Sequence, residues 1–109
     1  GRMAEKELIK PGGENVYPAE VESVIRQHPE IAEAVVIGVP DRQWGEAVKA
    51  VCVPAPGKDP GAAELSEYVA ARIARYKKPR FIEFVNALPK TAKGEIDREQ
   101  IKKDHGGRY

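Results

Sequence analysis

The chain has a single cysteine, Cys52, so it can form no disulfide within itself. This thiol lies in an alternating apolar run, which favours a buried core position over a reactive one and fits a reducing compartment. No stretch of the sequence is apolar for long enough to span a membrane, and no signal peptide is recognisable. We therefore expect a cytoplasmic protein without an integral membrane segment.

Excess charge of either sign is also lacking, since the 109 residues carry a formal net charge of +1. Such a balance gives no reason to expect nucleic acid or an anionic membrane as a partner, so any anion site must be local. The length suits one domain with a modest core. Residues 1–10 resemble a hinge or linker from a preceding domain, residues 11–105 the domain itself, and residues 106–109 a frayed tail.

Helix signals occur in three places. Pro18 suits the first position of a helix, which should end near His28-Pro29. A second helix, over residues 62–75, is expected because four apolar residues share one face at helical spacing. They are Leu65, Val69, Ile73 and Tyr76. Asp97 and Gln100 form a capping pattern for a third helix, which should run to about Lys103.

Strand signals alternate with these helices. Runs rich in β-branched residues predict strands over residues 31–39, 47–53 and 81–85, the first two antiparallel. A short apolar pair before Pro11 adds a short N-terminal hairpin. We therefore expect an α+β fold, in which a small sheet of about three main strands is flanked by about three helices.

Lys93 is the most informative residue of the sequence. It lies among small, flexible residues in the stretch Pro89–Arg98, where a lysine is a mobile cation able to reach an anion outside the domain. Gly12 and Gly13 mark a second special position. Two adjacent glycines permit positive φ angles and leave no side chain in the way of a close partner.

Two further features allow both a structural and a functional interpretation. Trp44, the only tryptophan, lies in a polar turn, either as a core anchor or as a platform on which a ligand stacks. The stretch Tyr76–Arg80 places three cations beside a ring. It is either a solvated helix end or a phosphate site with a ring for a base. The residues alone leave both alternatives open.

Four motifs resemble, in order and spacing, those of the adenylate-forming (AMP-binding) superfamily. They are Gly12–Glu22 (GGENVYPAEVE), Val39–Asp41 with Trp44–Glu46, Tyr76–Pro79, and Leu88–Thr91 with Lys93-Gly94. The resemblance spans nearly the whole chain and is closest to the small C-terminal domain of acyl-CoA synthetases and aryl-CoA ligases. It implies that the N-terminal adenylation domain, which would hold the carboxylic acid substrate, lies outside this sequence.

The resemblance implies an ATP-dependent, AMP-forming ligase that makes an acyl adenylate and then transfers the acyl group to coenzyme A. Lys93 matches the lysine of the first step. Gly12 and Gly13 match the turn that faces the active site in the second step, after the domain has rotated. Lys6 matches the hinge position, counting back from the glycines, whereas counting forward from Arg2 would choose Ala4.

Cofactor and partner expectations follow from the same resemblance. Contacts with coenzyme A are implied for Trp44, Tyr76, Lys78 and Arg80. ATP is expected with Mg²⁺ bound mainly by the absent domain. The lysine matched by Lys93 is acetylated in some relatives, which makes a lysine acetyltransferase a candidate partner. The alternative is a free-standing nucleotide-binding or protein-interaction module without catalysis, which the length of the intact gene product would distinguish.

Overall fold

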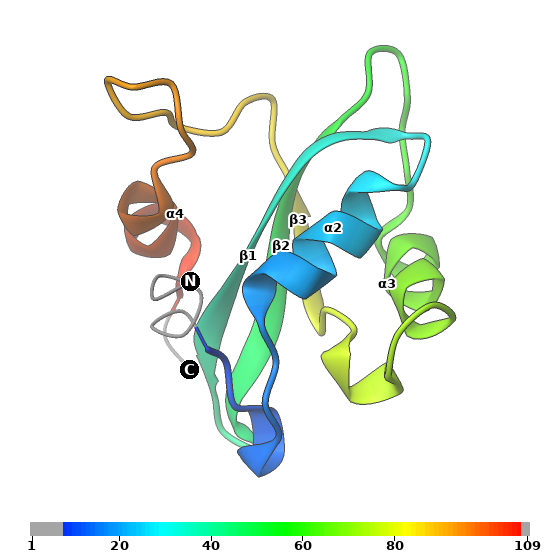
Figure 1. Ribbon diagram of the computed structural model, residues 1–109, viewed down its shortest axis with the longest axis vertical. Helices are drawn as coiled ribbons and strands as arrows, with labels where there is room; N and C mark the ends of the chain where they lie inside the picture. Colours follow the sequence, from blue (N-terminus) through cyan, green and yellow to red (C-terminus); the bar gives the residue numbers. More distant parts are fainter. Residues whose placement is uncertain (1–7, 108–109) are drawn as a thin grey trace.

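The computed structural model describes residues 8–107, which form a three-stranded sheet with helices packed on it (Figure 1). In chain order the elements are η1 (Pro11–Gly13), α2 (Pro18–Arg26), β1 (Ile31–Asp41), β2 (Gly45–Pro54), α3 (Ala62–Ala70), η2 (Arg75–Lys77), β3 (Phe81–Phe84) and α4 (Arg98–His105). The expected α+β class is confirmed. The expected N-terminal hairpin is a single antiparallel bridge between Ile9 and Val16.

The sheet has the order β1-β2-β3 and mixed pairing. β1 and β2 are antiparallel, as expected, and meet at the pair Asp41 and Gly45. β3 runs parallel to β2, from the pair Phe81 and Lys49 onward. A parallel pair requires a crossover between its strands, and α3 with η2 provides it. The chain therefore enters β3 at the end of the sheet where β2 began.

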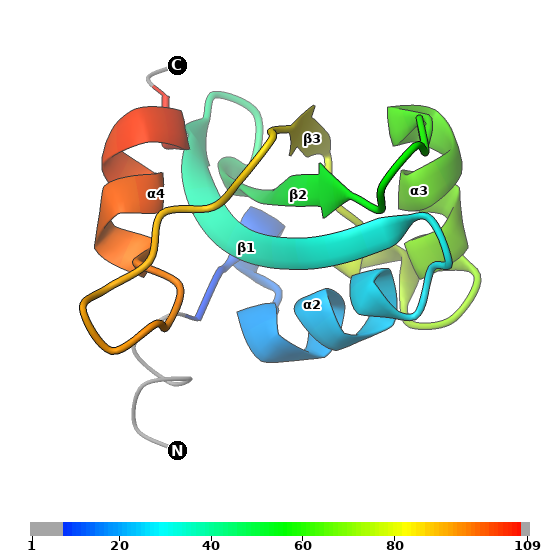
Figure 2. The same cartoon turned by 90° about the horizontal axis from the view of Figure 1, so that it is seen from above.

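The core lies on both faces of the sheet, because successive strand residues point to opposite sides. On one face Val36 packs in a cluster with Leu65 of α3 and with residues of α2. On the other face Val35 packs in a cluster with Ile101 of α4 (Figure 2). Cys52 is fully buried in the first cluster, and burial raises the pKa of its thiol to about 12. The prediction of a core thiol is confirmed.

Several predicted boundaries were wrong. The helix expected over residues 62–75 ends at Ala70, and Tyr76 is exposed instead of sharing a buried face with Leu65 and Val69. Ile73 still packs against the core from the turn that follows α3. The helical spacing of apolar residues therefore continues for three residues beyond the end of the helix. The other helices differ by a few residues, since α2 ends at Arg26 and α4 continues to His105.

The strands differ from expectation in length. β1 and β2 both continue to the turn that joins them, beyond their β-branched runs, because backbone pairing there does not depend on apolar side chains. β3 has only four residues. Within residues 8–107, none of the helices has the length and apolar character needed to cross a membrane.

Candidate functional site

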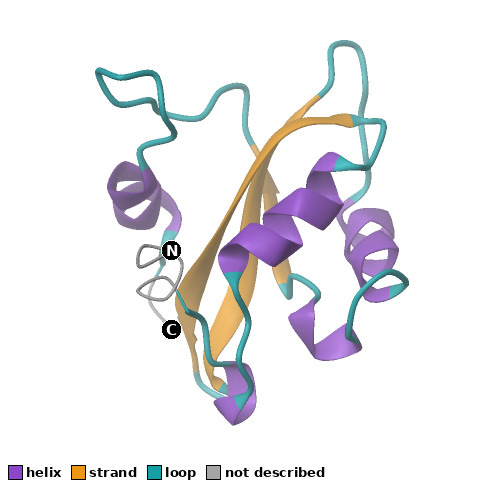
Figure 3. Cartoon of the chain, viewed as in Figure 1, coloured by secondary structure: helices purple, strands orange, loops and turns teal. Residues whose placement is uncertain are grey.

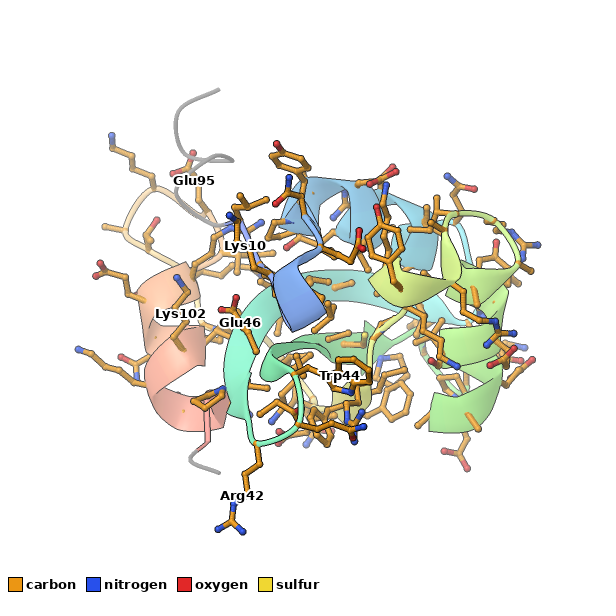
Figure 4. The ribbon with its side chains drawn as sticks, turned by 90° about the horizontal axis from the view of Figure 1, so that it is seen from below. Lys10, Arg42, Trp44, Glu46, Glu95 and Lys102 are labelled. Atoms are coloured by element: carbon orange, nitrogen blue, oxygen red, sulfur yellow. The ribbon has the colours of Figure 1, made fainter. Side chains whose placement is uncertain are left out.

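A cavity of about 730 Å³ lies at one end of the sheet, where η1, the β1–β2 turn and η2 come together. Figure 4 views this end of the molecule, with Trp44 near its centre. The lining includes five of the residues singled out from the sequence, which are Gly12, Trp44, Tyr76, Lys78 and Arg80. Three separate motifs therefore meet around one space.

Trp44 forms one wall of the cavity and is held by its backbone. Its N–H donates to Asp41 Oδ2 at 2.8 Å, and its carbonyl oxygen accepts from Gly12 N at 3.0 Å. The side chain is 47% exposed, which excludes the core-anchor alternative. The exposed ring is available for stacking.

Gly12 faces this ring at close range. Its φ is +58°, a conformation that L side chains rarely adopt. A Cβ atom at this position would also lie 2.9 Å from Trp44 Cε3. Both the backbone conformation and the space therefore require glycine. Gly13 has a φ of +86°, but a Cβ there would meet nothing within 4 Å, and Gly13 does not line the cavity.

The opposite wall carries a ring and ordered cations. Tyr76 in η2 is 44% exposed. Glu67 of α3 accepts from Arg75 Nη2 at 3.0 Å and from Lys78 Nζ at 3.1 Å. These hydrogen bonds, Arg75 first, lower the pKa of the Glu67 carboxyl to about 2 and raise the pKa of Arg75. Arg75 and Lys78 are therefore tied to α3 by ion pairs between solvent-accessible side chains.

Asp41 connects the two walls. Besides accepting from Trp44 N, its carboxylate lies 3.7 Å from Arg80 Nε, and its side chain is only 10% exposed. Arg80 N in turn donates to the carbonyl oxygen of Val48 in β2 at 2.9 Å. One carboxylate therefore contacts both the backbone of Trp44 and the guanidinium group of Arg80.

Sequence reasoning missed two members of this wall, Arg75 and Glu67. Arg75 directly precedes the recognised stretch, so its charge was a usable signal. Glu67 lies on a different element, and no spacing rule connects it to residues 8 and 11 positions later. Only the three-dimensional path of α3 and η2 brings them together.

Lys93 lies elsewhere, at the tip of a small loop closed by an antiparallel bridge between Lys90 and Ile96. Gly94, with a φ of +85°, donates its N–H to the carbonyl oxygen of Thr91 at 2.9 Å. Lys93 is exposed, and its backbone N–H donates to Thr91 Oγ1 at 3.3 Å. The turn thus fixes the backbone, and within residues 8–107 the Lys93 ammonium group takes part in no ion pair.

The base of this loop is well anchored. Asp97 N donates to the carbonyl oxygen of Pro89 at 2.8 Å, and Asp97 Oδ1 accepts from Gln100 N at 3.1 Å. The predicted cap of the last helix is confirmed. Lys90 Nζ also lies 2.9 Å from Glu33 Oε1 of β1. These contacts hold the base of the Lys93 loop, and Figure 3 colours the segment between β3 and α4 as loop.

The two candidate sites lie at opposite ends of the molecule. In Figure 1 the Lys93 loop is at the top, and η1 with the β1–β2 turn is at the bottom. No residue of the loop lines the cavity. The hinge candidate, Lys6, lies outside the described residues. Within residues 8–107 there is no group of three or more histidine, cysteine or acidic side chains arranged to hold a metal ion.

Comparison with known protein families shows to which family this chain belongs. The model of a family described as "AMP-binding enzyme C-terminal domain" matches residues 20–95. The chain belongs to this family. The match extends from α2 through the Lys93 loop, so the AMP-binding C-terminal domain includes four of the five cavity residues named above and Lys93.

Individual relatives of this AMP-binding C-terminal domain are ligases and synthetases. The chain is 43% identical over 97 residues, 89% of its length, to the fatty acid–[acyl-carrier-protein] ligase ScoC of Streptomyces coeruleorubidus. It is 44% identical over 101 residues, 93% of its length, to a feruloyl-CoA synthase of an Amycolatopsis species. The names of these two relatives specify different acyl acceptors.

A solved structure of a fatty acyl CoA synthetase contains the same fold as this chain. The Mycobacterium tuberculosis fatty acyl CoA synthetase superimposes with a TM-score of 0.86 and 40% identity, covering 93% of this chain and 20% of that one. The curated relatives are likewise matched over 19% and 21% of their own length. The chain therefore spans about a fifth of the proteins that it resembles.

Proposed function

We propose that this domain is the mobile C-terminal part of an ATP-dependent, AMP-forming acyl-CoA or aryl-CoA ligase. In one orientation it supplies Lys93 for acyl-adenylate formation. After rotation it presents the Gly12-Gly13 face for thioester formation with coenzyme A. The observation that carries the proposal is that the Lys93 loop and the Gly12 cavity lie at opposite ends of the domain.

The first step has a physical requirement that Lys93 meets. A carboxylate and a nucleotide phosphate, both anionic, must be brought together, and a cation between them offsets their repulsion in a closed site. The Lys93 side chain is exposed, and its loop is closed by backbone hydrogen bonds. An ammonium group on a flexible stem can therefore reach into a cleft on a partner domain.

The second step has requirements that the cavity meets. Coenzyme A carries phosphates and an adenine ring, which suit the cations and the exposed rings of this wall. Glu67 orders Arg75 and Lys78, so these cations are arranged before any ligand arrives. Because Gly12 has no side chain, the glycine turn can pack against the Trp44 ring at the edge of the cavity, through which a thiol-bearing arm would pass.

Co-substrates and location complete the proposal. ATP with Mg²⁺ would be bound mainly by the N-terminal adenylation domain, which also supplies the pocket for the carboxylic acid. The cytoplasm is the proposed compartment, because a reducing environment suits a reaction with a free thiol acceptor.

The test is Lys93→Ala in the full-length ligase. Adenylate formation, measured as pyrophosphate exchange into ATP, should fall about 100-fold or more, since it loses a charge aimed at the transition state. Thioester formation from preformed acyl adenylate should persist. Lys58→Ala is the matched control, because Lys58 is an exposed lysine on another loop. Exchange near the wild-type rate in Lys93→Ala would refute the assigned role.

The coenzyme role of the cavity has a separate test. Trp44→Ala and Arg80→Ala should raise the KM for coenzyme A in the full-length enzyme while pyrophosphate exchange stays close to wild type. Equal losses in both half-reactions would contradict a coenzyme site. Unchanged kinetics would refute the assigned coenzyme contacts of Trp44 and Arg80.

We also propose that acetylation regulates Lys93. The side chain is accessible at a loop tip, and acetylation would remove the charge on which the first step depends. A lysine acetyltransferase is the implied partner. Mass spectrometry after incubation with a cognate acetyltransferase and acetyl-CoA should find Lys93 modified, and an unmodified Lys93 would exclude this regulation.

A further inference from the structure

Glu46 joins β2 to the chain that leads into the glycine turn. Its Oε1 accepts from the backbone N–H of Lys10 at 2.7 Å, across 36 positions of sequence. Figure 4 shows Lys10 and Glu46 side by side where the chain approaches η1. Gly12 N donates to the carbonyl oxygen of Trp44. The segment Trp44–Glu46 therefore binds residues 10–12 at two points.

Gly38 provides the space for this carboxylate. It lies in the interior of β1, where glycine weakens a strand, and its φ is not in the left-handed region. The backbone therefore does not require glycine. A Cβ atom at Gly38 would overlap the Glu46 carboxylate and lie 2.9 Å from its Cδ. Glycine at this position leaves the Glu46 side chain free to reach Lys10.

The contact between Glu46 and Lys10 matters because small displacements of residues 10–12 would change the cavity beside them. A Cβ atom at Gly12 would lie 2.9 Å from Trp44 Cε3, so no side chain fits between this residue and the ring. A shift of residues 10–12 by a fraction of an ångström would therefore change the contact between Gly12 and the Trp44 ring, and with it the shape of the cavity beside them. Reaction geometry of this kind is sensitive to displacements of about 1 Å.

We propose that Glu46 is a positioning residue, whose carboxylate clamps the chain entering η1 and so holds Gly12 against Trp44. Gly38 is the second component, since its missing side chain makes room for the clamp. Glu46 also lines the cavity, but its role is to fix backbone. The effect on catalysis rests on the proposed function. The clamp serves thioester formation and leaves adenylate formation at the Lys93 end unaffected.

The first experiment measures the clamp itself by hydrogen–deuterium exchange of the backbone amides of Lys10, Gly12 and Gly13. Glu46→Ala should accelerate their exchange about tenfold or more, because a hydrogen bond to a charged acceptor is lost. Glu46→Gln should stay near wild type, since its amide oxygen accepts from the same N–H. Gly38→Ala should behave like Glu46→Ala, because the new methyl group displaces the carboxylate.

A double variant makes this test sharper. If Gly38 acts only through Glu46, the combined Gly38→Ala/Glu46→Ala protein should exchange no faster than Glu46→Ala alone. Additive effects would show that Gly38 supports the strand for another reason. Unchanged exchange in Glu46→Ala would overturn the clamp.

The second experiment measures the two half-reactions of the full-length ligase. Glu46→Ala and Gly38→Ala should slow thioester formation from preformed acyl adenylate about tenfold, and pyrophosphate exchange should change less than about twofold. Glu46→Gln should restore the thioester step. Equal loss of both half-reactions, with a lowered melting temperature, would indicate a merely structural role and overturn the proposal, as would an unchanged thioester step.

The two experiments separate this inference from the proposed function. A wild-type enzyme that forms no thioester with coenzyme A would refute the proposed function. The amide exchange rates would still decide whether Glu46 clamps residues 10–12. Accelerated exchange with a normal thioester step would leave the contact in place and refute its role in positioning.

Discussion

Replacing Gly12 by alanine probes the contact on which the cavity depends. The variant forces an L side chain into a φ of +58° and places a Cβ atom 2.9 Å from Trp44 Cε3, 3.4 Å from Cζ3 and 3.9 Å from Cδ2. The ring, which is partly exposed, must therefore move. We expect the variant to fold with a displaced Trp44 and a lower melting temperature.

The size of the effect follows from two contributions. A non-glycine residue in the left-handed region costs roughly 1–2 kcal/mol. Weakening the hydrogen bond between Gly12 N and the Trp44 carbonyl adds about 1 kcal/mol. For a domain of this size each kcal/mol lowers the melting temperature by about 4–6 °C, so Gly12→Ala should lower it by roughly 8–18 °C.

Gly13→Ala is the matched control. Its φ of +86° carries a similar backbone strain, but a Cβ there would meet nothing within 4 Å. This variant should therefore lose only the strain contribution, roughly 4–12 °C. Thermal unfolding followed by circular dichroism measures both variants. Because Trp44 is the only tryptophan of the chain, its fluorescence reports the ring movement, which should occur in Gly12→Ala alone.

One result would refute this reasoning. If both variants melt at the same temperature, and the Trp44 emission spectrum is unchanged in Gly12→Ala, the ring is not held by the glycine turn. The cavity wall would then be adaptable, and the close approach of Gly12 to Trp44 could not determine what enters it.

Two further predictions concern titrating groups. Burial raises the pKa of Cys52 from 9.0 to about 12, so at pH 8 the native chain has about a thousandfold less thiolate than the unfolded chain. Iodoacetamide at pH 8 should therefore label the native chain at least about a thousandfold more slowly than the unfolded chain. Equal labelling rates would contradict a buried thiol. The ion pairs with Arg75 and Lys78 lower the pKa of Glu67 from 4.5 to about 2. These ion pairs should therefore stabilise the fold fully above pH 4.5, and the stabilisation should be lost as the pH falls through about 2. Carboxyl NMR shifts should show this, and Arg75→Gln or high salt should return the pKa toward 4.5, since the site is exposed.

Local sequence signals predicted most of the elements. Pro18 begins α2, and Asp97 caps α4, because each feature depends on one residue and its immediate neighbours. The β-branched runs predicted the strands for the same reason. The end of α3 was missed, since Ile73 continues an apolar period although it packs from a turn.

Non-local features of the site could not be predicted in the same way. The motifs around Gly12, Trp44 and Tyr76 were recognised separately, but their convergence on one cavity depends on the tertiary path of the chain. The roles of Glu67 and Glu46 depend on contacts with other elements. Glu67 has no distinctive spacing and resembles an ordinary surface charge in the sequence. Glu46 lies in a recognised motif, but the motif does not indicate its contact with Lys10.

The parallel pairing of β3 with β2 has a mechanical consequence. Because β3 starts beside the cavity and leads away from it, the chain delivers Lys93 to the far end of a body 37 Å long. An antiparallel β3 would have returned the loop to the cavity. A partner domain that binds one end of this domain cannot contact the other end until the domain rotates. In the proposed function, this strand direction would keep the two half-reactions apart in time, because Lys93 and the Gly12 cavity lie at opposite ends of the domain.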